Sequence, residues 1–182
     1  MSNQPRVAKV LAALLVSMTF GAAVLLALGN NPPSEGPFCL NAYYRLQSLE
    51  DIVSSQASQY PLRWNRLEVY YSNTKSGNIQ QLSALQGLGS EVEINCHFIV
   101  CNGQGGKDGQ IQRTEKWNRQ WSVIPDAGWY GTDQTIRICV IGNQSQGKIT
   151  DSQLKRTEAL VELLYRKFNI QPSSIYYPDA WQ

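Results

Sequence analysis

Histidine, cysteine, serine and carboxylate side chains are the groups through which this chain could bind a metal or catalyse a reaction. The sequence of 182 residues contains one histidine, His97, in the segment HFIVCNGQGGKDGQIQ, and four cysteines. Zinc and iron sites normally take several imidazole, thiolate or carboxylate ligands at once, so a single histidine is a poor metal site. Cys96, Cys101 and Cys139 form no CxxC pair or other close ligand spacing. We therefore expect no metal and no other cofactor.

Nucleophilic and phosphate-binding chemistry also lack a matching motif. Ser72 and Ser83 lie in no GxSxG segment, and the spacing around His97 gives no catalytic triad. The glycine-rich segment NGQGGKDG (residues 102–109) lacks the GK[ST] ending of a phosphate loop. A strand is predicted after it, whereas a phosphate site needs a helix N-terminus there. We interpret this segment as a hairpin turn.

The cysteines have a second possible role as disulfide partners, because an exported domain with four of them favours such bonds. Cys96 and Cys101 are an odd number of positions apart on one predicted strand, so their side chains should point apart. A bond between Cys101 and Cys139 across neighbouring strands is one expectation. The alternative for Cys139 is a small buried core residue, and Cys39 is left unassigned.

The hydrophobic pattern predicts an α/β domain, with a mixed central β-sheet flanked by helices. Strands are expected where β-branched and aromatic residues alternate or gather, at residues 66–72, 94–101, 110–114 and 135–143. The segment 149–170 is typical of an amphipathic helix, with Thr150 as its cap and Gln153 three residues later. A further helix is expected over residues 38–58, closed by Pro61.

The N-terminus has the composition of a membrane segment. Residues 10–28 contain no charge and no proline, and at about 1.5 Å per residue they nearly match a hydrocarbon core of about 30 Å. Arg6 and Lys9 precede this run, whereas Arg45 is the first basic residue after it, so the N-terminus should be cytoplasmic. We expect an uncleaved anchor; a signal peptide cleaved near Gly29 is the alternative.

These patterns predict an order of segments along the chain. It comprises a cytoplasmic N-terminus (1–9), a transmembrane anchor (10–28), a linker (29–37), a helical extension (38–62) and one folded domain (63–182). The domain should therefore lie outside the cytoplasm, in the periplasm or extracellular space. The net charge of +2 provides no dense basic surface, so we expect no nucleic-acid partner.

Several segments occur in an order that is similar to a known family. These are RWxxLEVYYSNT, CHFIVCNGxxxxDGQIQxxxKWN, DAG, IRICVIGN, ITxxQxxxLxxLL and NIQPSSIYYP. Together they span about residues 63–178, and they resemble the N-acetylmuramoyl-L-alanine amidase and peptidoglycan recognition protein family. The resemblance implies the fold of that family around a groove for peptidoglycan fragments.

The same resemblance implies that the zinc site of the family is degenerate here. Tyr70 stands where the family has its first histidine ligand, and Pro178 lies in the segment where the second is expected. Few residues follow Pro178, so we expect no third ligand, an aspartate or cysteine in the family. Cys96 replaces a tyrosine that is thought to assist catalysis, and Asp126 replaces the histidine of a WHAG-type segment. His97 matches a framework position of a YHF-type segment, so we expect it to pack rather than to catalyse.

A ligand groove could survive the loss of zinc. The resemblance implies that the candidate groove residues border it, and aromatic faces among them could stack on sugar rings or cover a stem peptide. The candidates are Tyr70, Tyr71, Thr74, Trp117, Asp126 and Trp129. The alternative is that aromatic side chains fill the groove and close it.

Two functions from different classes remain open. The first is a membrane-anchored, catalytically inactive amidase-like domain that binds peptidoglycan fragments. The second is an envelope scaffold, or an accessory subunit of a membrane complex, that uses the fold for protein–protein contacts. An active hydrolase with an unusual site is a third, less favoured reading, because the ligands expected for zinc are missing.

Overall fold

A computed structural model describes residues 4–29, 46–60, 62–123, 132–143, 149–178 and 181. The chain divides into two compact units, Met1–Cys39 and Leu40–Gln182.

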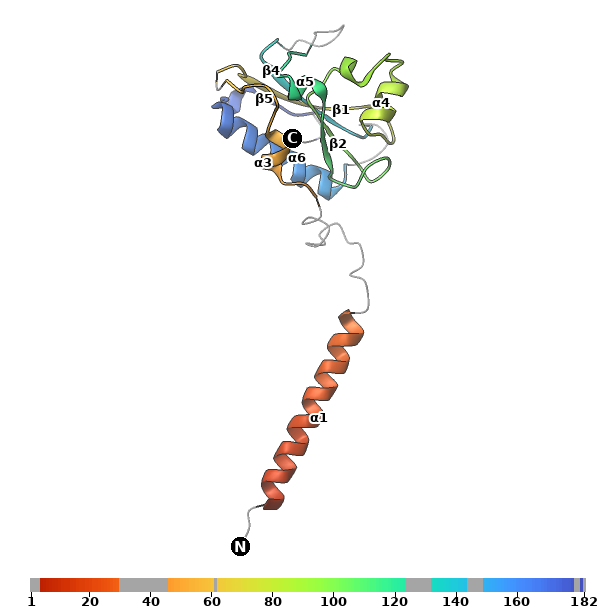
Figure 1. Ribbon diagram of the computed structural model, residues 1–182, viewed down its shortest axis with the longest axis vertical. Helices are drawn as coiled ribbons and strands as arrows, with labels where there is room; N and C mark the ends of the chain where they lie inside the picture. Colours follow the sequence, from red (N-terminus) through yellow and green to blue (C-terminus); the bar gives the residue numbers. More distant parts are fainter. Residues whose placement is uncertain are drawn as a thin grey trace. The chain divides into compact units, whose positions relative to one another are not determined.

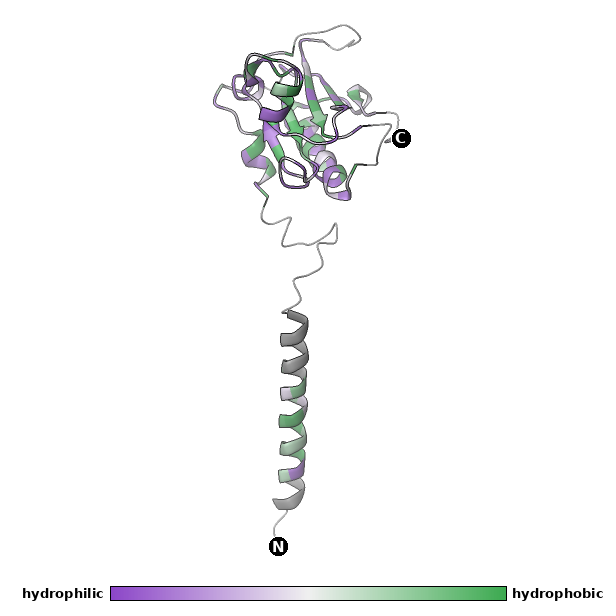
Figure 2. Ribbon diagram, turned by 90° about the vertical axis from the view of Figure 1, so that its right-hand side faces the viewer, coloured by the Kyte–Doolittle hydropathy of each residue, from purple (hydrophilic) through white to green (hydrophobic). Residues whose placement is uncertain are grey.

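The described part of the first unit is helix α1 (Gln4–Gly29). Large apolar side chains along it are exposed, among them Val10, Leu15 and Phe20, and the coloured part of the helix in Figure 2 is mostly hydrophobic. Within the described part of the chain, no helix combines the length and the apolar character needed to cross a membrane. The transmembrane helix expected over residues 10–28 is therefore not supported by the structure.

The second unit is built on a five-stranded sheet, with strand order β3-β2-β4-β1-β5 (Figure 1). Its strands are β1 (Arg66–Tyr71), β2 (Phe98–Val100), β3 (Ile111–Arg113), β4 (Thr135–Val140) and β5 (Ile175–Tyr176). β1, β2, β4 and β5 pair in parallel, whereas β3 is antiparallel to β2. The mixed sheet predicted from the sequence is confirmed.

Helices cover both faces of this sheet. On one face, α3 (Leu49–Val53) and α6 (Asp151–Phe168) pack against the larger apolar core. On the other face, α4 (Ile79–Leu85) packs over a smaller core around Ile99, Cys139 and Ile141. The remaining helices are α5 (Glu115–Asn118) and two short 3-10 turns, η1 (Glu91–Glu93) and η2 (Pro172–Ser174).

Helix α6 confirms the strongest local prediction. The Thr150 hydroxyl accepts a hydrogen bond from the Gln153 amide, and the Gln153 side chain accepts one from the Thr150 amide, which completes a capping box. Leu160, Val161 and Leu164 form the buried face. The helix ends at Asn169, which adopts the left-handed conformation that asparagine tolerates.

The helix predicted over residues 38–58 and the strand predicted over residues 94–101 are both much shorter than expected. Of the helix predicted over 38–58, residues 38–45 lie outside the described residues, and the remainder forms only α3. Side chains bind the carbonyl groups at its end: Arg113 donates to Asp51 and Ser54, and Trp117 donates to Val53. These carbonyls are thereby satisfied without another helical turn.

Strand β2 begins at Phe98 rather than at residue 94, because a side chain interrupts the ladder. The Arg137 amide of β4 donates to the Nδ1 atom of His97 instead of to a main-chain carbonyl. Regular pairing with β4 starts one residue later.

Candidate functional site

Register places four chemically active side chains on one face of the sheet. Glu68 pairs with Arg137, and Tyr70 pairs with Cys139, across the parallel strands β1 and β4. Side chains alternate along a strand, so these four share a face, while Leu67, Val69 and their neighbours point into the larger core. We call the side chains of Glu68, Tyr70, Cys96, Arg137 and Cys139 the Tyr70 face, because Tyr70 occupies the place of a zinc ligand in the family resemblance. Cys96 and Cys139 belong to the smaller core, and Tyr70 is half-buried against it.

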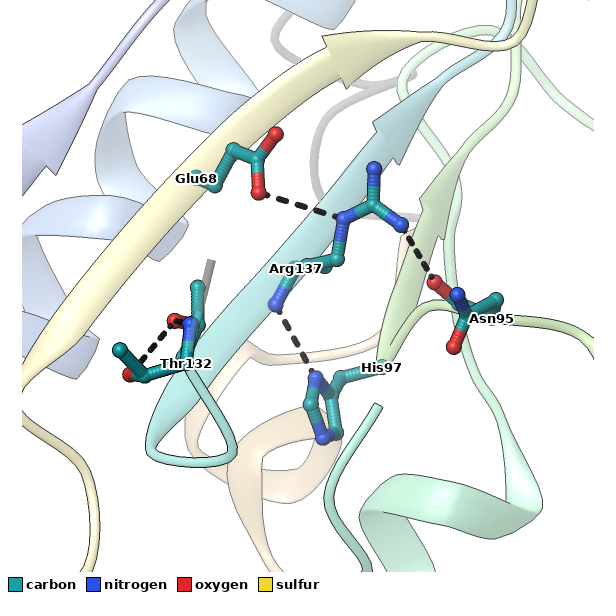
Figure 3. Close-up of polar contacts among 6 residues, drawn as sticks. Glu68, Asn95, His97, Thr132 and Arg137 are labelled. Atoms are coloured by element: carbon teal, nitrogen blue, oxygen red, sulfur yellow. Dashed lines mark hydrogen bonds and ion pairs between the residues drawn. The ribbon is translucent and has the colours of Figure 1, made fainter. Parts of the chain in front are cut away.

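Arg137 contacts Glu68, Asn95 and His97 (Figure 3). Its Nε atom lies 3.2 Å from Glu68 Oε2, and its Nη1 donates to the Asn95 carbonyl at 3.2 Å. Its guanidinium carbon lies 4.1 Å from the centroid of the Tyr70 ring. The Arg137 side chain is only 9% exposed and that of Glu68 17%, so the ion pair is largely removed from water. Such a pair holds the aromatic ring and the charge in a fixed arrangement.

Half-buried Tyr70 forms a hydrogen-bonded group with the buried Cys96 and Cys139, next to Arg137. Burial raises the pKa of Tyr70 well above its ordinary value. The hydrogen bond with Cys139 and burial together raise the pKa of the Cys96 thiol. Tyr70 and Cys96 are therefore protonated at neutral pH, and neither is poised as a nucleophile or as an anionic metal ligand. The hydrogen bond with Cys96 lowers the pKa of the buried Cys139 thiol.

The expected disulfide between Cys101 and Cys139 is wrong, because Cys96, Cys101 and Cys139 are all free thiols. Each of the three is buried in the domain core. Burial also raises the pKa of Cys101, to about 11. Cys39 lies outside the described residues.

His97 packs in the core, as its framework position in the family resemblance implies. It is fully buried, and Trp64 and Trp117 approach its ring edge-on at 4.9 and 5.9 Å. Because Nδ1 accepts the Arg137 amide proton, Nε2 must carry the hydrogen that it donates to the Trp121 carbonyl at 2.9 Å. Burial lowers the pKa of His97 to about 4. The ring is therefore a neutral link between β4 and the segment after α5.

The residues on the Tyr70 face do not fit a catalytic zinc ion. A protonated phenol and a protonated thiol are poor ligands, and the guanidinium group beside Tyr70 would repel a divalent cation. No group of three histidine, cysteine, aspartate or glutamate side chains within the described ranges could hold a metal ion. Pro178 has no side-chain donor. Asp126 and Trp129 lie outside the described residues.

The candidate groove residues that the structure describes, Tyr70, Tyr71, Thr74 and Trp117, do not come together on one surface. Tyr71 lies on the opposite face of β1 from Tyr70, and its hydroxyl accepts a hydrogen bond from Trp181 Nε1 at 2.7 Å. Thr74 lies in the loop after β1, where its hydroxyl is 2.7 Å from that of Ser72.

Trp117 requires a correction, because it is fully buried in the larger core. Its ring centroid lies 4.5 Å from that of Phe98, and its Nε1 donates to the Val53 carbonyl. The expectation that Trp117 lines a groove is wrong, since no part of the side chain is exposed to a ligand.

Sequence reasoning missed the pair formed by Glu68 and Arg137. A signal for it was present: each is a charged residue inside a strand whose neighbours are apolar, and buried charges are normally paired. Trp181 was also missed, although its indole donates a hydrogen bond to the Tyr71 hydroxyl and stacks on Tyr177.

A mixed sheet with helices on both faces, and with the Tyr70 face on β1 and β4, defines an α/β domain of the amidase type. The pattern of the family described as N-acetylmuramoyl-L-alanine amidase matches residues 55–178, and the chain belongs to this family. The comparison with curated proteins gave no match.

Solved structures of low sequence identity are similar to the chain. The N-acetylmuramoyl-L-alanine amidase LysC from Clostridium intestinale URNW is 19% identical, with 68% of this chain and 76% of that chain covered and a TM-score of 0.49. Drosophila peptidoglycan recognition protein PGRP-SA is 16% identical, with 68% and 73% covered and a TM-score of 0.42. Human PGRP-IBETAC, solved in complex with glycosamyl muramyl pentapeptide, is 13% identical, with 75% and 79% covered and a TM-score of 0.42.

Proposed function

We propose that this protein binds peptidoglycan fragments through the exposed parts of Tyr70 and Glu68 on the Tyr70 face and does not hydrolyse them. The observation that carries the proposal is the match of residues 55–178 to the amidase family. It is combined with the arginine-supported Tyr70, at the position where the family resemblance implies a zinc ligand. The amidase fold that would hold a muropeptide is retained, whereas other residues stand where the family resemblance implies the zinc ligands.

The polar groups of the Tyr70 face suit binding better than hydrolysis. Amide hydrolysis by this family requires a zinc ion that activates water, and neither the Tyr70 phenol nor the Cys96 thiol offers an anionic ligand at neutral pH. In contrast, the exposed part of an aromatic ring can stack on a sugar ring or cover a peptide group. A muramyl peptide contains both of these groups.

Titration of the full chain with a muramyl peptide tests the binding site. An aromatic contact is worth about 1 kcal/mol beyond its area, so Tyr70→Ala should weaken binding about fivefold. Tyr71→Ala is the matched control: it removes the same side chain from the next position on the opposite face of β1, and should change the affinity less than about twofold.

Two results would count against muropeptide binding at the Tyr70 face. Equal effects of Tyr70→Ala and Tyr71→Ala would show that the losses are structural and that the face does not bind. Absence of binding by the parent chain would remove the muropeptide proposal and favour the scaffold function.

We also propose that residues 10–28 hold the protein at a membrane, with the domain outside the cytoplasm. The sequence supports this proposal through nineteen residues without a charge, preceded by Arg6 and Lys9. The uninterrupted helix α1 includes all of these residues.

Fractionation of cells that produce the full chain tests this attachment. The parent chain should remain with the membranes after alkaline extraction, whereas Leu15→Arg should release a large part of it, because a charge in the apolar run costs about 2.5–3.5 kcal/mol. Val16→Leu is the control and should leave the distribution unchanged. A mature N-terminus near Asn30 would contradict the proposal, since it would identify a cleaved signal peptide.

A further inference from the structure

We propose that the open edge of β3 binds an extended acidic peptide segment of a partner protein, at a site separate from the Tyr70 face. β3 is an outer strand of the sheet, and two other strands separate it from β1. None of the residues that line the site belongs to the Tyr70 face.

A pocket of about 380 Å³ lies along this edge. β3 and the residue before it form its floor, and the walls come from both sides of the sheet: Gln47 and Ile52 near α3, and residues 78–80 with Glu91 near α4. A second pocket of about 200 Å³ shares Gln47, Ile52, Gln110 and Ile111 with the first, and continues to Lys107. The two pockets therefore form one groove, which we call the β3 groove, and its length follows the strand.

The backbone of β3 offers hydrogen bonds to an added strand. The Gln110 carbonyl accepts from Cys101, and the Thr114 amide donates to the His97 carbonyl, so both of these residues bond toward β2. Alternate residues of an antiparallel strand bond to the same neighbour, which places the amide and carbonyl groups of Ile111 and Arg113 on the outer side. Among the described residues, no group outside the sheet bonds to these outer groups.

The side chains of the β3 groove favour a peptide over a glycan. No aromatic ring lines it, although sugar recognition commonly relies on stacking against one. Ile79 is half-buried and provides an apolar contact for a side chain of an extended peptide, and amide groups form the rim. Ile52 and Ile111 also line the groove but are almost fully buried. Strand addition uses main-chain hydrogen bonds for affinity and such pockets for specificity.

Charge specifies the kind of peptide. Lys107 and Arg113 line the β3 groove with Glu91 as the single carboxylate. The Arg113 guanidinium donates to the main-chain carbonyl oxygens of Asp51 and Ser54. Neither Lys107 nor Arg113 forms an ion pair within the described part of the domain. A segment with acidic residues at its ends complements this distribution.

Titration of the full chain with three capped peptides tests the β3 groove. The probes are TEVTVET, its basic counterpart TKVTVKT, and TEVTVET with N-methyl groups on its three central residues. TEVTVET should bind and shift the amide resonances of Ile111 and Arg113, and TKVTVKT should bind about tenfold more weakly. The N-methylated peptide should show no binding, because it cannot donate to the strand edge.

A charge reversal at the end of the groove provides the matched comparison. Lys107→Glu should weaken binding of TEVTVET several-fold, whereas Lys75→Glu, at another exposed lysine, should not, with equal melting temperatures confirming that both variants fold. The proposal is overturned if TEVTVET does not bind, if N-methylation leaves its affinity unchanged, or if the shifted resonances map to Tyr70 and Arg137. Muropeptide binding is unaffected by any of these outcomes, because the two sites share no residue.

Discussion

Replacing Trp117 by alanine is expected to lower the free energy of unfolding by about 3–5 kcal/mol, the range for removing a large aromatic side chain from a core. Trp117 is fully buried, where it contacts Trp64, Phe98 and Phe168 and donates to the Val53 carbonyl. The substitution removes these contacts and leaves a cavity between β2, α3 and α6. Chemical denaturation of the parent and variant chains measures the difference.

Trp121→Ala is the matched control for this substitution. Trp121 is 44% exposed, and the Arg119 guanidinium lies over its ring. Its truncation should cost less than about 1 kcal/mol, because an exposed side chain leaves no cavity. Equal losses for the two tryptophans would contradict the assignment of Trp117 to the core. A loss of muropeptide affinity by Trp117→Ala at unchanged stability would also contradict this assignment, since it would indicate that Trp117 lines a ligand groove.

Acidification is expected to destabilise the domain through His97 as the pH falls from about 6.5 to about 4. The ordinary pKa of 6.5 applies to the unfolded chain, and burial lowers the pKa to about 4 in the folded domain. Between these values the unfolded chain binds more protons, so stability rises with pH in this window and is lost as the pH falls through it. The difference between the two pKa values corresponds to a loss of stability of roughly 3 kcal/mol. This loss is complete below about pH 4 and absent above about pH 6.5.

His97→Gln isolates this contribution, because glutamine has no group that titrates in the window. The parent chain should lose about 3 kcal/mol more than the variant between neutral pH and pH 4, whatever the absolute stability of the variant. Denaturation curves at a series of pH values provide the comparison. Parallel pH profiles would show that His97 is not a buried neutral ring.

The sequence predicted those helices and strands that depend on interactions between neighbouring residues. The capping box at Thr150, the apolar face of α6 and the strands β1, β3 and β4 all follow from neighbouring residues. Helices α4 and α5 were not predicted, because seven and four residues are too few to display a helical period. The end of α3 depends on side chains of Arg113 and Trp117 from distant parts of the chain, which no local pattern contains.

The candidate site was predictable only in part for the same reason. The place of Tyr70 followed from the family resemblance, but its support by Arg137 and Glu68 depends on the register between β1 and β4. Trp117 was assigned to a groove because the family resemblance implies that its segment, KWN, borders that groove. Its burial results from packing against α3 and α6, which the order of segments does not specify.

The central claim is that this domain has kept the fold of the amidase family and has lost its hydrolytic activity. Incubation of the full chain with a muropeptide and a zinc salt, followed by separation of the products, tests it most directly, with an active amidase as the positive control on the same substrate. The account predicts that intact muropeptide is recovered, with no free stem peptide above the control without protein. Release of stem peptide that depends on the chain and is abolished by a chelator would contradict it.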